Sequence, residues 1–278
     1  MLIMTCWICA SYGSKYRIET TSPFNPVIKE TTMKIGIIGA GNIGATLARK
    51  FSAAGHQVLL ANSRGPQSIQ SLATEAGAVA ATVTDAVKDV DVVVISIPQK
   101  AVPHLPKALF AGLPENVVII DTGNYYPAVR DETITAIEGG IPESQWVSQQ
   151  IGRPVVKAFN SIMAQSLATK GQPAGTKGRI ALPVSGDDAQ AKKIVIGLVD
   201  EAGFDAIDAG TLAESWRHQP GAPAYCTDLD ADELRLALTK ADKARSPQLR
   251  DLTLQKMAGL APGYTGEDLL KINRSLHE

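Results

Sequence analysis

Three glycines, Gly39, Gly41 and Gly44, have the G-x-G-x-x-G spacing that can hold a dinucleotide. In such a motif the first glycine permits a tight turn and the second lets the backbone approach a pyrophosphate. The third allows a helix to pack closely on a strand. The free N–H groups at the start of that helix then bind the phosphates. We therefore predict a dinucleotide-binding turn made of Gly39, Ala40, Gly41, Asn42, Ile43 and Gly44.

The residues after the next apolar run favour NADP(H) over NAD(H). The run Gln57–Ala61 has the composition and length of a buried strand. Directly after it, about 20 residues past the glycine motif, come Asn62, Ser63 and Arg64. NAD-binding proteins place an Asp or Glu there to bind the ribose 2′-hydroxyl. A guanidinium with two short polar side chains suits a 2′-phosphate instead, because Arg forms charge-assisted hydrogen bonds with phosphate. The alternative is a solvated arginine at a strand end.

Candidates for acid–base chemistry are few. No Tyr is followed by a Lys four residues later, so the pair used by short-chain dehydrogenases is missing. The four histidines show no ligand spacing, and we expect no metal site. His218 and Tyr225 lie in a segment of loop-like composition that could cover the site, and each is a candidate proton donor. The alternative for each is an ordinary surface loop residue.

A second possible pair is Lys157 and Asn160, which have the Lys-x-x-Asn spacing of β-hydroxyacid dehydrogenases. In those enzymes the two residues share one face of a helix. Here Pro154 and the valines that follow it predict a strand, on which positions three apart point to opposite faces. We therefore expect that these two residues do not act as such a pair.

Alternating strands and helices must position these side chains. Ile43, Leu47 and Phe51 form an apolar stripe after the glycine motif, which a surface turn would not explain. Ligands bind at the carboxyl ends of strands in open sheets, so Asn124, just after the apolar run 117–121, is a predicted polar contact. Other runs of strand length are 91–97, 154–159, 179–184 and 204–208, and Asp187 or Asp188 caps a helix before the last. The pattern predicts an α/β domain over residues 33–210, with a Rossmann-type, doubly wound, mainly parallel sheet.

The chain changes character at its two ends. Residues 211–278 predict a small helical extension, with helices near 230–244 and 247–257. Such additions close the substrate side or form a homodimer interface, and both alternatives stay open. Residues 1–32 predict a disordered leader, with Met33 as the natural start; a targeting or docking arm is the rival interpretation. Cys6 and Cys9 in this leader have C-x-x-C spacing but no second pair to complete a zinc site.

Composition limits the possible partners. The chain has 278 residues, of which 45% are hydrophobic and 20% charged, as in globular proteins. Its net charge is −1 and no basic stripe is visible, so nucleic acid is not an expected partner. No apolar stretch reaches the length of a membrane span, so we expect no membrane partner. Three cysteines in a chain of this length suggest a reducing compartment, and we predict a cytoplasmic protein.

The order of several motifs resembles a known family. The segments GIIGAGNIGATLARKF, NSR, VVVISIP, VVKAFNS, LPVSGDD and IDAG, between Met33 and Leu212, are similar to those of NADP oxidoreductases related to the deazaflavin-coenzyme-dependent NADP reductases. A similar module forms the cytosolic domain of membrane ferric reductases. The resemblance implies NADP(H) as cofactor, with Asn62, Ser63 and Arg64 at the 2′-phosphate. It also implies that Ser96, Ile97 and Pro98 line the path from adenosine to nicotinamide, and that Ala158, Phe159 and Asn160 lie near the nicotinamide.

These implied roles have simpler alternatives, and the resemblance ends before the C-terminal region. Ser96 and Pro98 could merely end a strand, and Phe159 could merely pack in the core. After Leu212 the sequence no longer matches the deazaflavin enzymes, so their substrate does not transfer. Pyrroline-carboxylate reductases are further relatives, but they need a longer helical domain than remains here.

The predicted function is an NADPH-dependent oxidoreductase that transfers hydride between NADP(H) and a flavin-like or other small acceptor. Direct hydride transfer to a flavin-like acceptor demands little acid–base help, because the cofactor carries the chemistry. The alternative is a non-catalytic NADP(H)-binding regulatory protein or subunit. The segment 216–228 discriminates between them, since an enzyme needs it to enclose a pocket beside the nicotinamide.

Overall fold

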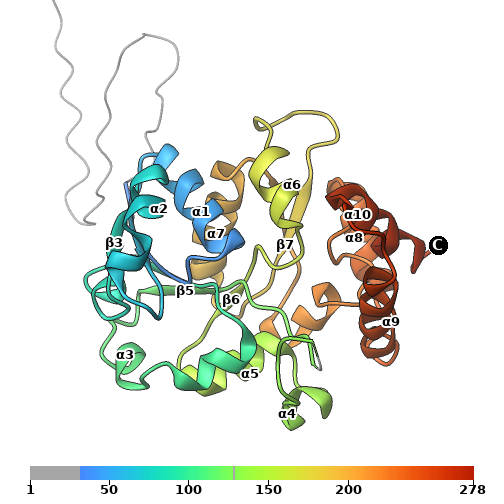
Figure 1. Cartoon of the computed structure of the whole chain (residues 1–278), viewed down its shortest axis with the longest axis horizontal. Helices are drawn as coiled ribbons and strands as arrows, with labels where there is room; N and C mark the ends of the chain where they lie inside the picture. Colours follow the sequence, from blue (N-terminus) through green and yellow to red (C-terminus); the bar gives the residue numbers. More distant parts are fainter. Residues whose placement is uncertain (1–31, 128) are drawn as a thin grey trace, which may run out of the picture.

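In the computed structural model, residues 32–127 and 129–278 are described, and they contain one main sheet (Figure 1). The sheet has six strands in the order β3-β2-β1-β4-β5-β6, and every neighbouring pair is parallel. This is the predicted Rossmann-type architecture. The predicted leader and its two cysteines lie outside the described residues. The strands are β1 Lys34–Ile38, β2 Gln57–Ala61, β3 Val79–Ala81, β4 Val92–Ile95, β5 Val118–Asp121 and β6 Val156–Lys157.

The last two predicted strands, β7 Ala181–Val184 and β8 Asp205–Asp208, form a separate two-stranded parallel sheet. It is joined to the main sheet by an antiparallel bridge between Lys157 and Ser185. Their backbones exchange two hydrogen bonds, with N···O distances of 2.8 and 3.0 Å. The small sheet therefore continues from the edge strand β6 and carries the chain towards the C-terminal region.

Both faces of the main sheet are covered, which explains the continuous apolar runs in its strands. Successive side chains of β1 alternate between the faces. Ile35 and Ile37 pack in one core with Phe51 of α1, whereas Ile38 packs in another with Trp146 of α5. Figure 1 shows α1 and α7 on one side of the sheet and α3 and α5 on the other. The helices of this part are α1 Asn42–Ala53, α2 Gln70–Glu75, α3 Ala108–Ala111, α4 Thr135–Glu138, α5 Glu143–Ile151, α6 Ala164–Thr169 and α7 Ala189–Glu201.

Some helices begin at a short polar side chain that caps them. Asp188 accepts a hydrogen bond from the Ala191 N–H at 2.6 Å, so it is the cap of α7 and Asp187 is not. Asp230 caps α8, Ala231–Lys240, and exchanges hydrogen bonds with Glu233 in a capping box. Caps of this kind satisfy N–H groups that have no partner inside the helix.

The C-terminal region contains a 3₁₀ helix, η4 Leu212–His218, followed by α8 Ala231–Lys240, α9 Ser246–Ala258 and α10 Gly266–Ser275. Leu234 and Leu238 of α8 pack against Ala181 and Ile207 of the small sheet. Helices α9 and α10 contact each other, and Figure 1 shows all three helices at the same end of the molecule. Within the described ranges, no helix is long and apolar enough to cross a membrane.

Candidate cofactor and active site

The glycine motif forms the turn between β1 and α1, and its three glycines meet different surroundings. Gly39 has φ +120°, and a Cβ there would lie 2.0 Å from the Ser96 carbonyl oxygen. A Cβ on Gly44 would lie 1.9 Å from the Gly39 carbonyl oxygen. A Cβ on Gly41 would meet no described atom within 4 Å. The fold therefore requires the first and third glycines, whereas the second faces open space at the start of α1.

The start of α1 is suited to an anion. Gly41 is the N-cap, it has no side chain to cap the helix, and the first turn contains no acidic residue. The first N–H groups of a helix have no partner inside it, and the helix dipole favours negative charge there. A pyrophosphate over Gly41 would satisfy these donors.

A first cavity of about 680 Å³, here called the nucleotide cavity, extends from the glycine turn to the end of β2. Its wall includes Asn62, Ser63 and Arg64, as predicted. The Asn62 side chain fixes this corner, because its Oδ1 accepts from the Arg64 N–H at 3.1 Å and its Nδ2 donates to Ser68 Oγ at 2.9 Å. Arg64 is exposed, and its guanidinium has no hydrogen bond or ion pair with any described residue. It is thus free to bind a phosphate.

A second cavity of about 320 Å³, here called the inner cavity, adjoins the first. The two share Gly41, Ser96, Ile97 and Pro98, so an extended dinucleotide could pass from one to the other. Asn124, Phe159 and Asn160 line the inner cavity. Ala158 lies in neither wall and is buried in the apolar core. Ala40 lines the nucleotide cavity, Asn42 and Ile43 line the inner cavity, and Gly44 packs beneath the turn.

Two residues of the inner cavity have backbone angles that non-glycine residues rarely adopt. Phe159 has φ 59° and Cys226 has φ 51°. The Phe159 ring packs edge-on against Phe51 with centroids 6.0 Å apart, so this side chain also belongs to the core. Strained residues of this kind persist where the surrounding structure holds them, and they cluster at functional sites.

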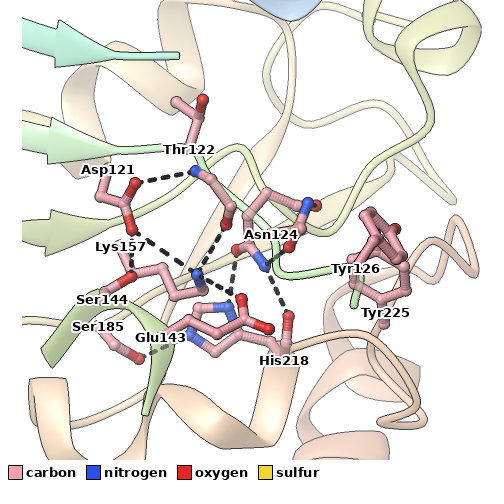
Figure 2. A network of polar contacts seen from close by, with 12 residues as sticks. Asp121, Thr122, Asn124, Tyr126, Glu143, Ser144, Lys157, Ser185, His218 and Tyr225 are labelled. Carbon is pink, nitrogen blue, oxygen red and sulfur yellow. Dashed lines mark hydrogen bonds and ion pairs between the residues drawn. The ribbon is translucent and has the colours of Figure 1, made fainter. Parts of the chain in front are cut away.

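His218 organises a buried hydrogen-bond network behind the inner cavity (Figure 2). Its Nδ1 lies 3.0 Å from Asn160 Oδ1, and its Nε2 lies 2.8 Å from Ser185 Oγ. Asn160 Nδ2 donates to the His218 carbonyl at 2.7 Å and to Asn124 Oδ1 at 3.1 Å. The network therefore ties the C-terminal segment to the residues that follow β5 and β6.

The surface-loop alternative for His218 is wrong, because the side chain is 0% exposed. Burial lowers its pKa well below 6.5, and the nearby Lys157 charge lowers it further. A neutral imidazole with both nitrogens engaged, outside the described wall of the inner cavity, is poorly placed to donate a proton to a ligand. His218 instead positions Asn160.

Tyr225 lies in the wall of the inner cavity and is only 8% exposed, so it is not a surface loop residue either. Its hydroxyl forms a hydrogen bond with the Tyr126 hydroxyl. Burial raises the pKa of Tyr225 well above 10, and it raises the pKa of the adjoining Cys226 thiol to about 12. Both groups therefore stay protonated at neutral pH.

A buried ionic cluster at the ends of β5 and β6 was not predicted as part of the site. Lys157 Nζ donates to the Gly123 carbonyl at 2.9 Å and lies 3.4 Å from Glu143 Oε2 and 3.9 Å from Asp121 Oδ2. Asp121 also accepts from Ser144 Oγ at 2.5 Å. Burial raises the pKa of Glu143 to about 7, although the Lys157 charge opposes this. The cluster ties the loop after β5 to β6 and α5, through the contacts of Lys157 with the Gly123 carbonyl and Glu143 (Figure 2).

The cluster also corrects the argument about Lys157 and Asn160. The predicted strand is present, but it ends at Lys157, and the chain turns at Phe159. Asn160 therefore lies beyond the strand, where it forms a hydrogen bond with His218, whereas Lys157 Nζ binds the Gly123 carbonyl and Glu143. The premise that both residues lie on one strand was wrong, and the expectation that they do not act as a β-hydroxyacid dehydrogenase pair stays a prediction.

Comparison with known proteins agrees with this geometry. Residues 34–125 match the family described as "NADP oxidoreductase coenzyme F420-dependent". The Escherichia coli K12 protein YjhV is 35% identical over 105 residues, which are 38% of this chain and 77% of that protein. The structure of the hypothetical protein SMa0349 from Sinorhizobium meliloti is 32% identical, with a TM-score of 0.60 over 73% of this chain and 98% of its own. The chain belongs to the F420-dependent NADP oxidoreductase family.

A more distant structure shows the same fold. A protein from Arthrobacter sp. FB24, assigned as an F420-dependent NADP reductase, is 22% identical and has a TM-score of 0.53. The match covers 66% of this chain and 87% of that one. The family's cofactor is NADP, so the chain is an NADP(H)-dependent oxidoreductase, as the resemblance of its motifs implied.

The residues present fit this cofactor. The space over Gly41, the uncapped start of α1 and the unpaired Arg64 guanidinium together supply what a pyrophosphate and a 2′-phosphate require. Across the described residues, no group of three or more His, Cys, Asp or Glu side chains could hold a metal ion.

Proposed function

We propose that this oxidoreductase transfers a hydride from NADPH to a flavin-like or other small acceptor held in the inner cavity. The observation that supports this most is the position of Tyr225 and Cys226, which line the inner cavity together with Gly41 of the glycine turn. An enzyme, unlike a dinucleotide-binding regulator, needs an enclosed space beside the nicotinamide for a second molecule. The C-terminal segment supplies one wall of that space.

In this proposal each group of the dinucleotide has its own partners. The N–H groups at the start of α1 bind the pyrophosphate, and Asn62, Ser63 and Arg64 bind the 2′-phosphate. Ser96, Ile97 and Pro98 line the passage between the cavities. Phe159 and Asn160 lie beside the nicotinamide, with the Asn160 amide held by His218 and Asn124. Bound NADPH supplies the two electrons and the proton of a hydride.

The chemistry of the inner cavity favours an acceptor that needs no proton from a side chain in the slow step. Tyr225 and Cys226 keep their protons at neutral pH, because burial raises both pKa values. His218 is neutral and buried behind the wall. A flavin-like ring accepts the hydride directly and can take its second proton from water. A carbonyl or imine acceptor would instead depend on the Tyr225 hydroxyl as hydrogen-bond donor.

An NADPH-oxidation screen over flavins, quinones, imines and ferric chelates tests the proposal. NADPH deuterated at C4 should transfer its label to at least one reduced acceptor that keeps a carbon-bound hydrogen. A deazaflavin is the best such acceptor, because its hydride lands on carbon. If no compound is reduced and no label moves, the chain is instead an NADP(H)-binding regulatory protein or subunit.

A further inference from the structure

A third cavity, of about 300 Å³, lies beneath the C-terminal helices and is here called the outer cavity. It is formed by the loop after β5, the residue before α6, the segment 220–226, and helices α9 and α10. Its wall is predominantly apolar. The apolar and aromatic side chains of this wall include those of Tyr126, Val129, Met163, Leu254, Met257 and Leu269. A cavity of this size is at the lower end of the range for small-molecule sites and suits a ring system or alkyl group.

The outer cavity adjoins the inner cavity. Arg130, Met163, Tyr225 and Cys226 line both. Tyr225, which is hydrogen-bonded to the Tyr126 hydroxyl, thus stands with Met163 at the border between the two cavities. The glycine turn and Arg64 do not line the outer cavity, so the residues assigned to the dinucleotide leave it unused.

The charges around the outer cavity are already paired. Arg130 donates to Asp131 at 2.9 Å and to the Asn124 carbonyl, and it lies over the Tyr126 ring at 5.2 Å. Arg250 lies 2.8 Å from Asp251 and 3.5 Å from Glu138. The wall therefore offers apolar surface without an uncompensated charge, which favours an uncharged ligand group over an anionic one.

We propose that the outer cavity is a second subsite for the acceptor, which binds an uncharged aromatic ring or alkyl group while the reducible atom lies in the inner cavity. This inference rests on the proposed function. It assigns the acceptor to a class of elongated molecules with an apolar end. It also gives the helical extension a role, because α9 and α10 supply one side of the subsite.

The first test measures binding without turnover. The full chain, saturated with NADP⁺, is titrated with prodan, a neutral fluorescent naphthalene ketone whose emission shifts to the blue in apolar surroundings. Leu254→Trp or Met257→Trp fills the outer cavity and should weaken prodan binding by at least about tenfold. Leu252→Trp is the matched control, because Leu252 is on the same helix but is 38% exposed and does not line the cavity. Melting temperatures identify any variant that fails to fold.

The second test uses pairs of acceptors that share one reducible core, with and without an apolar substituent. In Leu254→Trp, the ratio of kcat/KM for the substituted acceptor to that for its core should fall at least about tenfold. In Leu252→Trp the ratio should stay unchanged. If the NADPH affinity is unaltered in both variants, the change in the kcat/KM ratio comes from the interaction with the acceptor and not from cofactor binding.

The outcomes separate this inference from the proposed function. Prodan binding that the cavity-filling variants leave unchanged would overturn the inference, even if NADPH reduces a small acceptor. Weakened binding in those variants would support the apolar subsite even if the screen finds no hydride acceptor, which would refute the proposed function. If prodan binding is lost as protein concentration rises, a second copy of the chain fills the cavity and the inference is wrong.

Discussion

Arg64 provides the sharpest test of cofactor choice. It stands at the rim of the nucleotide cavity, is exposed, and makes no ion pair with a described residue, so its charge is available to a ligand. A hydrogen bond to a charged group contributes about 1.5–3 kcal/mol. Since about 1.4 kcal/mol corresponds to a factor of ten, Arg64→Ala should weaken NADPH binding by about 10- to 150-fold. NADH has no 2′-phosphate, so its affinity should barely change.

The assay is calorimetric titration of both cofactors, and of 2′,5′-ADP against 5′-AMP to isolate the phosphate. Arg49→Ala is the matched control, because Arg49 is exposed on α1, lines neither the nucleotide nor the inner cavity, and carries the same charge. The loss in Arg64→Ala should also shrink at high salt, which screens an exposed charge pair. Equal losses for NADPH and NADH, or an equal effect of Arg49→Ala, would refute the 2′-phosphate assignment.

Four further predictions concern substitutions of single residues. Gly41→Ala should fold normally, because its Cβ meets no described atom, yet bind NADPH at least about tenfold more weakly; Gly44→Ala should instead lower the melting temperature. Tyr225→Phe should change KM more than kcat if the acceptor is flavin-like, whereas a fall in kcat of about 100-fold would identify Tyr225 as the acid. His218→Ala should raise the acceptor KM and cost about 1–3 kcal/mol of stability in urea unfolding, since Asn160 and Ser185 lose a buried partner. The pKa of Glu143 is raised to about 7 in the folded chain, so its protonated carboxyl stabilises the fold fully below pH 4.5, and this stabilisation is lost as the pH rises to 7. Across that range the free energy of unfolding of the wild type should fall by up to about 3 kcal/mol relative to that of Glu143→Gln. Parallel pH profiles of the two proteins would contradict this.

The nucleotide half of the site was predictable because its signals are local. The glycine spacing, the apolar strands and the polar residues after β2 all follow from backbone rules that act within a few residues. Strand β3 was missed because three residues, Val79–Ala81, are too short to show a pattern. Helix α10 was missed although Thr265 and Asp268 form a capping box that the sequence displays.

The inner cavity depends on tertiary packing that no local pattern encodes. The segment from η4 to Tyr225 has the composition of a loop, and burial of His218 follows from its contacts with Asn160 and Ser185. Helix α5 was not predicted, because its buried residues Glu143 and Ser144 are polar and do not form an apolar stripe. Their contacts with Lys157 and Asp121 in the ionic cluster account for their burial. The Lys-x-x-Asn spacing and the aspartate that ends β5 were the available signals for this cluster.

The two halves of the site come from different stretches of the chain, and this permits them to change separately. Among the described residues, those that line the nucleotide cavity all lie between Ile38 and Pro106, inside the segment matched by the family model. The wall of the inner cavity also includes Ile162, Met163, Ala164, Tyr225 and Cys226, which lie outside the segment matched by the family model. If the acceptor binds in the inner cavity as proposed, mutations at these five positions can alter which molecule is reduced without touching the residues assigned to the reductant. Descendants of one ancestral gene could in this way keep a common electron source while acquiring new substrates.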